Sequence, residues 1–194
     1  QGMEPLSPQP LLSNSANAKN EDMHLYGYMN HTFTHDGISY GFDLFIKKQS
    51  YEFLKIGENL AEGDFQNTYE LVQAWMRSPE HKKNILDHGF RDIGVSVFMI
   101  TNPSGTARAV YVQHFGVAQS MCPHKVLNLQ DQYHQLEEQL TLKKAHIETL
   151  DPNQQGVYQQ EIDSYNELIQ RMNTMVQDIN SQIRRYNQCV EKFL

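Results

Sequence analysis

The sequence predicts an α+β domain followed by an antiparallel helical hairpin, with the change between them at Cys122 and Pro123. Before this point, turn residues, aromatic residues and mixed hydrophobic periodicities alternate, as they do in a globular α+β domain. After it, Gln, Glu, Asn and Leu dominate, and the first glycine is Gly156. We therefore expect two domains, which comprise residues 1–120 and residues 121–194.

The second half carries a heptad pattern, which is typical of helices that pack along a seam. An earlier run over residues 129–150 has the same spacing, with one polar interruption at Lys143. Residues 151–156 separate the two runs and contain Pro152 and Gly156, which stop helices and turn the chain. The second run places apolar residues at steps of four and three, at Tyr158, Ile162, Tyr165, Ile169, Met172, Val176, Ile179, Ile183, Tyr186, Val190 and Phe193.

Cys122 and Cys189 are the two cysteines of the chain. Each lies at a similar distance from the predicted turn, so that a hairpin would bring them to the same end. A disulfide closing a loop of this size stabilises by about 4 kcal/mol in the chain-entropy model, and it persists only in an oxidising compartment. The alternative is a pair of unrelated buried thiols, since free cysteine is often simply part of a core.

Helices are predicted at three places in the first half. Residues 12–30 have a helix-compatible pattern, and residues 67–77 place their apolar side chains on one helical face. Ser78 and Pro79 are a start signal for a second short helix, with Ser78 as the N-cap. Between the first two helices, residues 30–37 are expected to form a loop that ends in an Asp-Gly turn.

A pair of antiparallel strands is predicted near the end of the first half. Residues 93–99 alternate between apolar and polar or small side chains, and residues 107–115 return after a turn at residues 102–105. Helices followed by such a strand pair favour an α+β sandwich.

Charge and composition limit the partners. The formal net charge of −7 would repel nucleic acid and anionic membrane surfaces at long range, and neither is expected as a partner. No apolar run approaches the roughly 18 residues that a membrane span requires. The chain begins Gln-Gly without an export signal, so we expect any such signal to lie outside this sequence.

Five ordered blocks of the first half resemble bacterial members of the CAP superfamily, the SCP-like extracellular proteins related to cysteine-rich secretory proteins, antigen 5 and plant pathogenesis-related proteins. The resemblance spans about residues 6–118 and implies a three-layer α-β-α sandwich and an extracellular or cell-envelope location. The leading helix of the family is short or absent here, and the helical hairpin lies outside the resemblance. The blocks are EDMHLYGYMNHTFTHDG, GENLAEG, VQAWMRSPEHKKNIL, FRDIGVSV and YVQHFG.

The resemblance also implies candidate site residues. Eukaryotic members of the family place two His and two Glu around a cavity that can hold a divalent metal. His31 matches the first His and Glu58 the first Glu, whereas Ser78 and Val110 stand where the second Glu and the second His would be. His114 is four residues from Val110 along the strand, about 13 Å away, and is not expected to replace the missing His.

A binding cleft is expected at His31, Glu58, Asn59, His81 and Gln113. His31 and Glu58 are the candidate catalytic residues. With His81 they would form a two-His, one-carboxylate set for Zn²⁺ or Mg²⁺ if all three converge. The alternative is that Glu58 is an anchor without a metal, which hydrogen-bonds backbone amides and is held by His31.

Three functions remain open. The preferred hypothesis is a secreted or envelope-associated binding module, not an enzyme, for a small lipid-like ligand or a peptide. The second is a metal-dependent hydrolase that uses the reduced His/Glu site. The third is an interaction protein whose coiled-coil-like hairpin binds a protein partner or pairs with a second copy into a four-helix bundle.

Overall fold

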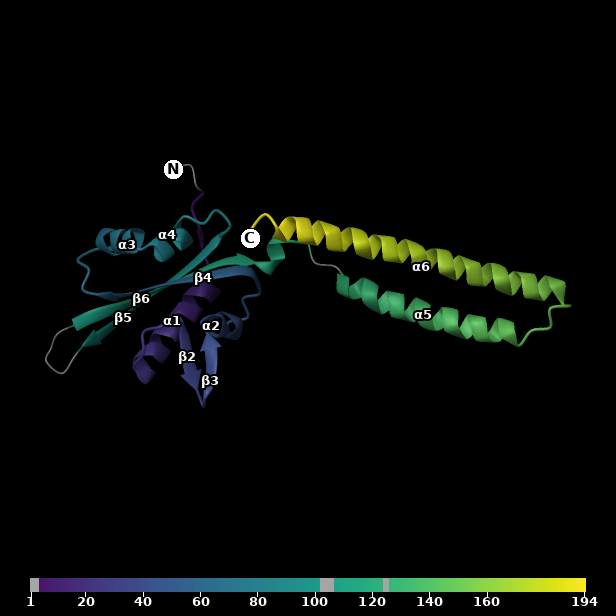
Figure 1. Ribbon diagram of the computed structural model, residues 1–194, viewed down its shortest axis with the longest axis horizontal. Coiled ribbons are helices and arrows are strands. Elements are labelled where there is room, and N and C mark those ends of the chain that lie inside the picture. Colours follow the sequence, from purple (N-terminus) through teal and green to yellow (C-terminus); the bar gives the residue numbers. More distant parts are fainter. Residues whose placement is uncertain (1–3, 102–106, 124–125) are drawn as a thin grey trace. The chain divides into compact units, whose positions relative to one another are not determined.

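The computed structural model describes residues 4–101, 107–123 and 126–194, and these form two compact units (Figure 1). The N-terminal unit extends to Met121 and includes Lys192–Leu194. The hairpin unit comprises Cys122–Glu191. The turn predicted at residues 102–105 lies outside the described residues.

A four-stranded sheet forms the middle of the N-terminal unit. Strand β6 is central and runs antiparallel to both β4 and β5, and its register places His114 opposite Glu58. The short strand β1 is parallel to β5 and pairs with it at Asp92 and Ile93. The order across the sheet is β1 (Ser7–Pro8), β5 (Asp92–Thr101), β6 (Ala107–Ala118) and β4 (Phe53–Gly63).

Helices cover both faces of this sheet, as Figure 1 shows. Helix α1 (Pro10–Tyr26) packs on β5 and β6, and α2 (Asp43–Lys48) packs on α1. Helices α3 (Thr68–Arg77) and α4 (Pro79–Ile85) contact β4 from the other side. The three-layer α-β-α sandwich is therefore confirmed, and so is the expected α+β class.

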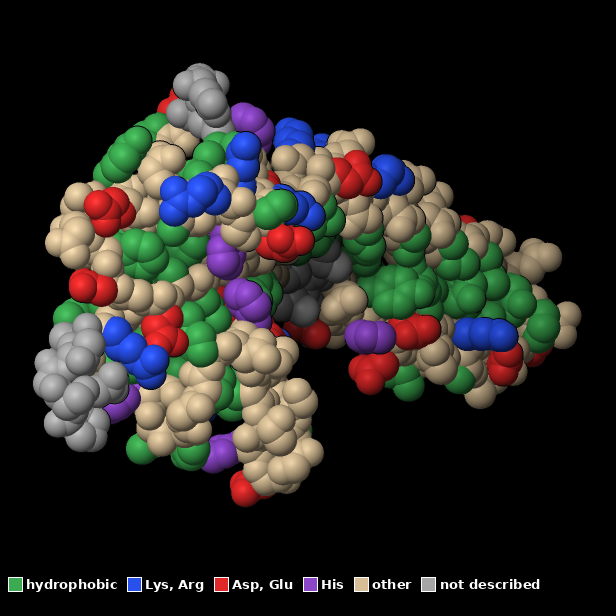
Figure 2. All heavy atoms as spheres, turned by 60° about the vertical axis from the view of Figure 1, so that its left-hand side comes forward, with side chains coloured by type: hydrophobic (Ala, Val, Ile, Leu, Met, Phe, Trp, Pro, Cys, Tyr) green, Lys and Arg blue, Asp and Glu red, His purple; other side chains and the backbone are tan. Residues whose placement is uncertain are grey.

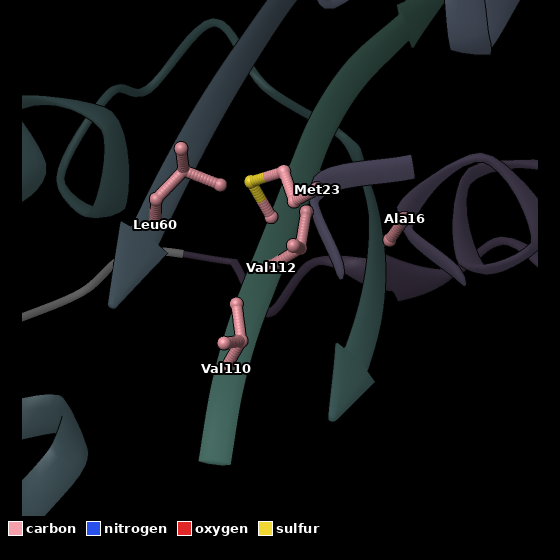
Figure 3. Close-up of a cluster of buried hydrophobic side chains, with 5 residues drawn as sticks. All are labelled: Ala16, Met23, Leu60, Val110 and Val112. Carbon is pink, nitrogen blue, oxygen red and sulfur yellow. The ribbon is translucent and has the colours of Figure 1, made fainter. Parts of the chain in front are cut away.

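The core between α1 and the sheet consists of side chains that the helical repeat of α1 and the alternation of the strands turn toward each other. Ala16 and Met23 are seven residues apart on one face of α1, and they pack with Leu60, Val110 and Val112 of the sheet (Figure 3). Val110 and Val112 alternate with residues that point to the opposite face. Complete burial of each large aliphatic side chain contributes about 1.5–3 kcal/mol, so this cluster fixes α1 on the sheet.

Local signals explain the bounds of α1. Pro10 occupies the first turn, and the Gln9 side chain accepts a hydrogen bond from the Leu11 amide. The helix ends at Tyr26, earlier than predicted, because Gly27 adopts a left-handed conformation with φ 68° and its N–H bonds to the Met23 carbonyl.

The loop predicted at residues 30–37 is instead a small β-hairpin. Strands β2 (Thr32–His35) and β3 (Ile38–Gly41) pair antiparallel around Asp36 and Gly37. Both turn residues have positive φ, 50° and 77°, as a tight two-residue hairpin turn requires. Ser78 stands at the N-cap of α4 as expected, but its side chain makes no capping hydrogen bond.

The hairpin unit consists of α5 (Val126–Glu148), the turn after it and α6 (Gln155–Val190). A disulfide joins Cys122 and Cys189, which confirms the predicted pairing. Lys143, the interruption in the predicted seam, forms an ion pair with Glu161 of the facing helix at 2.5 Å. Within the described part of the chain, no helix combines the length and apolar character needed to cross a membrane.

Gly94 allows α1 to approach β5 closely. A Cβ at this position would lie 2.1 Å from the Leu12 carbonyl carbon and 2.2 Å from the Ser13 nitrogen. The first turns of α1, which carry Ser15, therefore lie directly on the sheet.

We predict that Gly94→Ala lowers the unfolding free energy by about 1–3 kcal/mol, because the added methyl group must displace helix backbone. Urea denaturation measures this loss. Val95→Ala is the matched control on the same strand and should have an effect of less than about 1 kcal/mol, since Val95 is more than half exposed. Equal effects of the two substitutions would contradict the role given to Gly94.

Candidate functional site

Glu58 lies in the middle of β4 with a fully buried carboxylate that two imidazoles share. His31 Nδ1 is 2.7 Å from its Oε1, and His114 Nε2 is 2.9 Å from its Oε2. His114 Nδ1 in turn lies 2.7 Å from the hydroxyl of Ser15 on α1. Four side chains therefore form one continuous hydrogen-bonded chain, which we call the Glu58 network.

The proton positions in this network follow from its chemistry. An ionised carboxylate only accepts hydrogen bonds, so His31 Nδ1 and His114 Nε2 must both carry hydrogen. The Ser15 hydroxyl is within 2.8 Å of the Leu12 carbonyl as well as of His114 Nδ1. His114 and Ser15 are completely buried, whereas half of the His31 side chain is exposed. The network thus extends from the half-exposed His31 to Ser15, on the face of α1 that packs against the sheet.

Electrostatics favour the charged form of Glu58. Burial by itself raises the pKa of this carboxyl, but the hydrogen bonds from His114 and His31, with the charge of nearby Lys19, more than offset it. The net result is a pKa below the ordinary value, and Glu58 is ionised at neutral pH.

Lys19 is a buried cation beside the network. Its Nζ donates to the Asn30 carbonyl at 2.7 Å and lies over the rings of Tyr28, Phe33 and Phe45 at 4.7, 5.5 and 5.3 Å. Burial lowers the pKa of this ammonium, and the neighbouring carboxylates partly offset the change. Lys19 therefore connects α1 to the aromatic side chains around the segment that carries His31.

The residues next to the network in sequence point to the other face of the sheet. Asn59 donates to Gln113 Oε1 and to the His81 carbonyl, both at 3.2 Å. Asn84 donates to Asn59 Oδ1 at 2.9 Å and to the Glu58 carbonyl at 3.0 Å. These bonds attach α4 to β4 and β6, so Asn59 and Gln113 do not share a surface with the Glu58 carboxylate.

His81 interacts with Asn59 on one face of the sheet and with His31 of the Glu58 network. Its backbone carbonyl accepts a hydrogen bond from Asn59. Burial lowers the pKa of His81, and the charge of His31 lowers it further. The described residues contain no group of three or more His, Cys, Asp and Glu side chains arranged to hold a metal ion. The Zn²⁺ or Mg²⁺ set of His31, Glu58 and His81 stays a prediction.

Two expectations about Glu58 are wrong. Among the described residues, its carboxylate is bonded to His31, as the anchor alternative expected, but its other partner is the His114 imidazole and not a backbone amide. The separation of about 13 Å between His114 and Val110 along β6 does not bear on this contact, because Val110 is paired with Glu62, whereas His114 is the cross-strand partner of Glu58. Antiparallel register between the two blocks was the signal that would have identified His114.

An apolar cleft of about 380 Å³ lies between α3 and the outer face of β5 and β6. Trp75 is held at its wall by a hydrogen bond from Nε1 to the Leu60 carbonyl, and the rings of Phe65 and Tyr111 meet edge to face. Val97, which lines the cleft, is 59% exposed, so the cleft is open on the β5 side. Gln113 brings a polar amide to the lining.

Glu58→Gln is predicted to lower the unfolding free energy at neutral pH by about 1–3 kcal/mol, because the amide oxygen can accept from one imidazole while the amide NH2 group faces the donor of the other, and one of the two imidazoles, His114, is completely buried. Since the folded pKa of Glu58 is lowered, its contribution is present above the ordinary value of 4.5 and is lost as the pH falls through the folded value. The difference between the wild type and the variant should therefore shrink in acid, as followed by urea denaturation at several pH values.

Glu62→Gln is the matched control on the same strand. Glu62 pairs with Arg108 in a partly exposed position, and its loss should cost about 0–1 kcal/mol. If both substitutions cost the same, or if the Glu58→Gln difference is independent of pH, the ionised anchor is contradicted.

The chain is similar to known bacterial proteins over its N-terminal unit. The family model described as CAP, the cysteine-rich secretory protein family, matches residues 1–115. An uncharacterized protein of Bacillus subtilis strain 168, YkwD, is 41% identical over 97 residues, which are 49% of this chain and 35% of that protein. The chain thus spans about a third of the length of this relative. A solved outer surface protein of Borrelia burgdorferi is 22% identical, with a TM-score of 0.49 over 60% of this chain and 80% of that structure. With more than half of its residues matched, the chain belongs to the CAP, or cysteine-rich secretory protein, family.

Proposed function

We propose that the protein is a binding module that holds a lipid-like molecule in the cleft beside α3, and that the Glu58 network is a structural anchor. The observation that carries this proposal is the cleft itself, whose walls are aromatic and aliphatic and whose volume falls within the range of small-molecule sites. Gln113 adds one polar group to the lining, which suits a ligand with an apolar chain and a polar end.

The contacts of Glu58 support the role of an anchor. A general base must be within hydrogen-bonding reach of the proton that it removes. Both oxygens of Glu58 already accept hydrogen bonds from imidazoles, and its side chain is fully buried. The Ser15 hydroxyl, which stands at the inner end of the network, is also completely buried. This arrangement favours binding over the metal-dependent hydrolase.

The cleft and the Glu58 network share strand β6 but lie on opposite faces of the sheet. Gln113 lines the cleft and bonds to Asn59, whereas His114, the next residue, faces α1. A rigid sheet between them keeps the cleft wall in place. We therefore assign ligand contact to the α3 side and stability to the α1 side.

An extracellular or cell-envelope location is part of the proposal. The Cys122–Cys189 disulfide requires an oxidising compartment, and the family is described as secretory.

We predict that Val97→Asp weakens binding of dansyl-undecanoic acid at least about tenfold, because a carboxylate in the cleft must lose water or repel the acid group of the probe. Fluorescence titration measures this change. Met99→Asp is the matched control, since Met99 is the next outward residue of β5, is 61% exposed and does not line the cleft.

The outcomes separate the hypotheses. Met99→Asp should keep the wild-type affinity within about twofold, as a surface change distant from the ligand does. Equal loss in both variants, or a wild-type protein that does not bind the probe, would overturn the cleft as the ligand site. A hydrolytic activity that Glu58→Gln abolishes in a folded protein would instead support the hydrolase.

A further inference from the structure

The two helices of the hairpin unit leave much of their seam uncovered. Leu136 is a buried residue of α5, but α6 has no buried residue along its whole described length. The seam residues Val176 and Ile183 are more than a third exposed, and Leu142, next to the seam position Lys143, is 72% exposed. Figure 2 shows the hydrophobic side chains that result along the hairpin, next to acidic and basic ones. Four-helix bundles bury such apolar positions in a shared core.

One groove between α5 and α6 is continuous along the hairpin. It consists of two adjoining hollows of about 600 and 490 Å³, which share Glu167 and Arg171. We call it the hairpin groove. Its apolar lining comes from both helices and includes Leu129, Leu136, Leu142, Leu168 and Met175.

Two charged residues of the hairpin groove, Glu167 and Arg171, are complementary to themselves under a twofold rotation. Glu167 and Arg171 are shared by the two hollows, so they mark the middle of the groove. If a second α6 lies antiparallel across this point, residues before Ile169 face residues equally far after it. Glu167 then meets Arg171 of the second copy, and Arg171 meets Glu167. Isologous interfaces of dimers have this property.

The size of the surface suits a dimer. Helix α5 has 23 residues, which corresponds to a length of about 35 Å, and two helices side by side are about 20 Å wide. This surface of about 700 Å² is close to the roughly 800 Å² that each partner buries in a stable interface.

We propose that the hairpin groove binds a second copy of this chain, antiparallel and twofold, to form a four-helix bundle with reciprocal Glu167–Arg171 pairs. The dimer is independent of the ligand proposed for the cleft. In this dimer, the helices of each copy cover the apolar side chains that the hairpin unit of the other copy exposes.

Charge reversal of the full chain tests the proposal. In a dimer of Arg171→Glu both pairs at the centre of the twofold interface are acid against acid, and in a dimer of Glu167→Arg both are base against base. Each variant alone should therefore dimerise at least about tenfold more weakly than the wild type in analytical ultracentrifugation. Mixing the two variants should restore a 1:1 dimer, since every intermolecular pair is then opposite in charge. Within each variant the two residues on one helix still repel, so only contacts between copies explain this rescue.

Two controls accompany the mixture. Arg184→Glu changes the same charge on an exposed part of α6 outside the hairpin groove and should leave the dimer unchanged. Far-ultraviolet circular dichroism of each variant checks that the helices stay folded. A wild-type protein that stays monomeric far above the concentration used for the ligand titration, or folded variants whose mixture does not recover the dimer, would overturn the proposal.

Discussion

The N-terminal unit depends on the hydrogen bonds that the buried carboxylate of Glu58 accepts from two imidazoles. A charge removed from water is costly unless it is paired, and here each oxygen accepts from one imidazole. Hydrogen bonds to an ionised group are about twice as strong as neutral ones, so the pair of imidazoles offsets much of that cost. Through His114 and Ser15 the carboxylate connects β4 and β6 to α1, and through His31 it connects them to the start of β2.

The period of two along a strand separates the anchor from the cleft. Glu58 and His114 face α1, whereas Asn59 and Gln113 face α4 and the cleft beside α3. Strand β6 thereby contributes to the Glu58 network on one face of the sheet and to the wall of the apolar cleft on the other. The close approach of α1 to β5 at Gly94 brings Ser15 within hydrogen-bonding distance of His114.

Local patterns allowed the hairpin and its disulfide to be predicted, because heptad spacing and a Pro/Gly turn act over short stretches of chain. The partners of Glu58 could not be found in this way. His114 belongs to another strand, and only the antiparallel register brings it opposite Glu58. The sequence does not predict the strands of the β2–β3 hairpin, because four residues each are too few for a clear alternation, although Asp36-Gly37 marks the turn.

Nitrogen-15 NMR of the histidine side chains tests the central claim most directly. Long-range proton–nitrogen spectra distinguish a protonated ring nitrogen from an unprotonated one in each imidazole. An ionised Glu58 that accepts from both rings requires hydrogen on His114 Nε2 and on His31 Nδ1 at neutral pH. Spectra that show both nitrogens protonated would support the anchor. An unprotonated His114 Nε2 would mean that Glu58 is the donor, and the account of a buried ionised carboxylate would be contradicted.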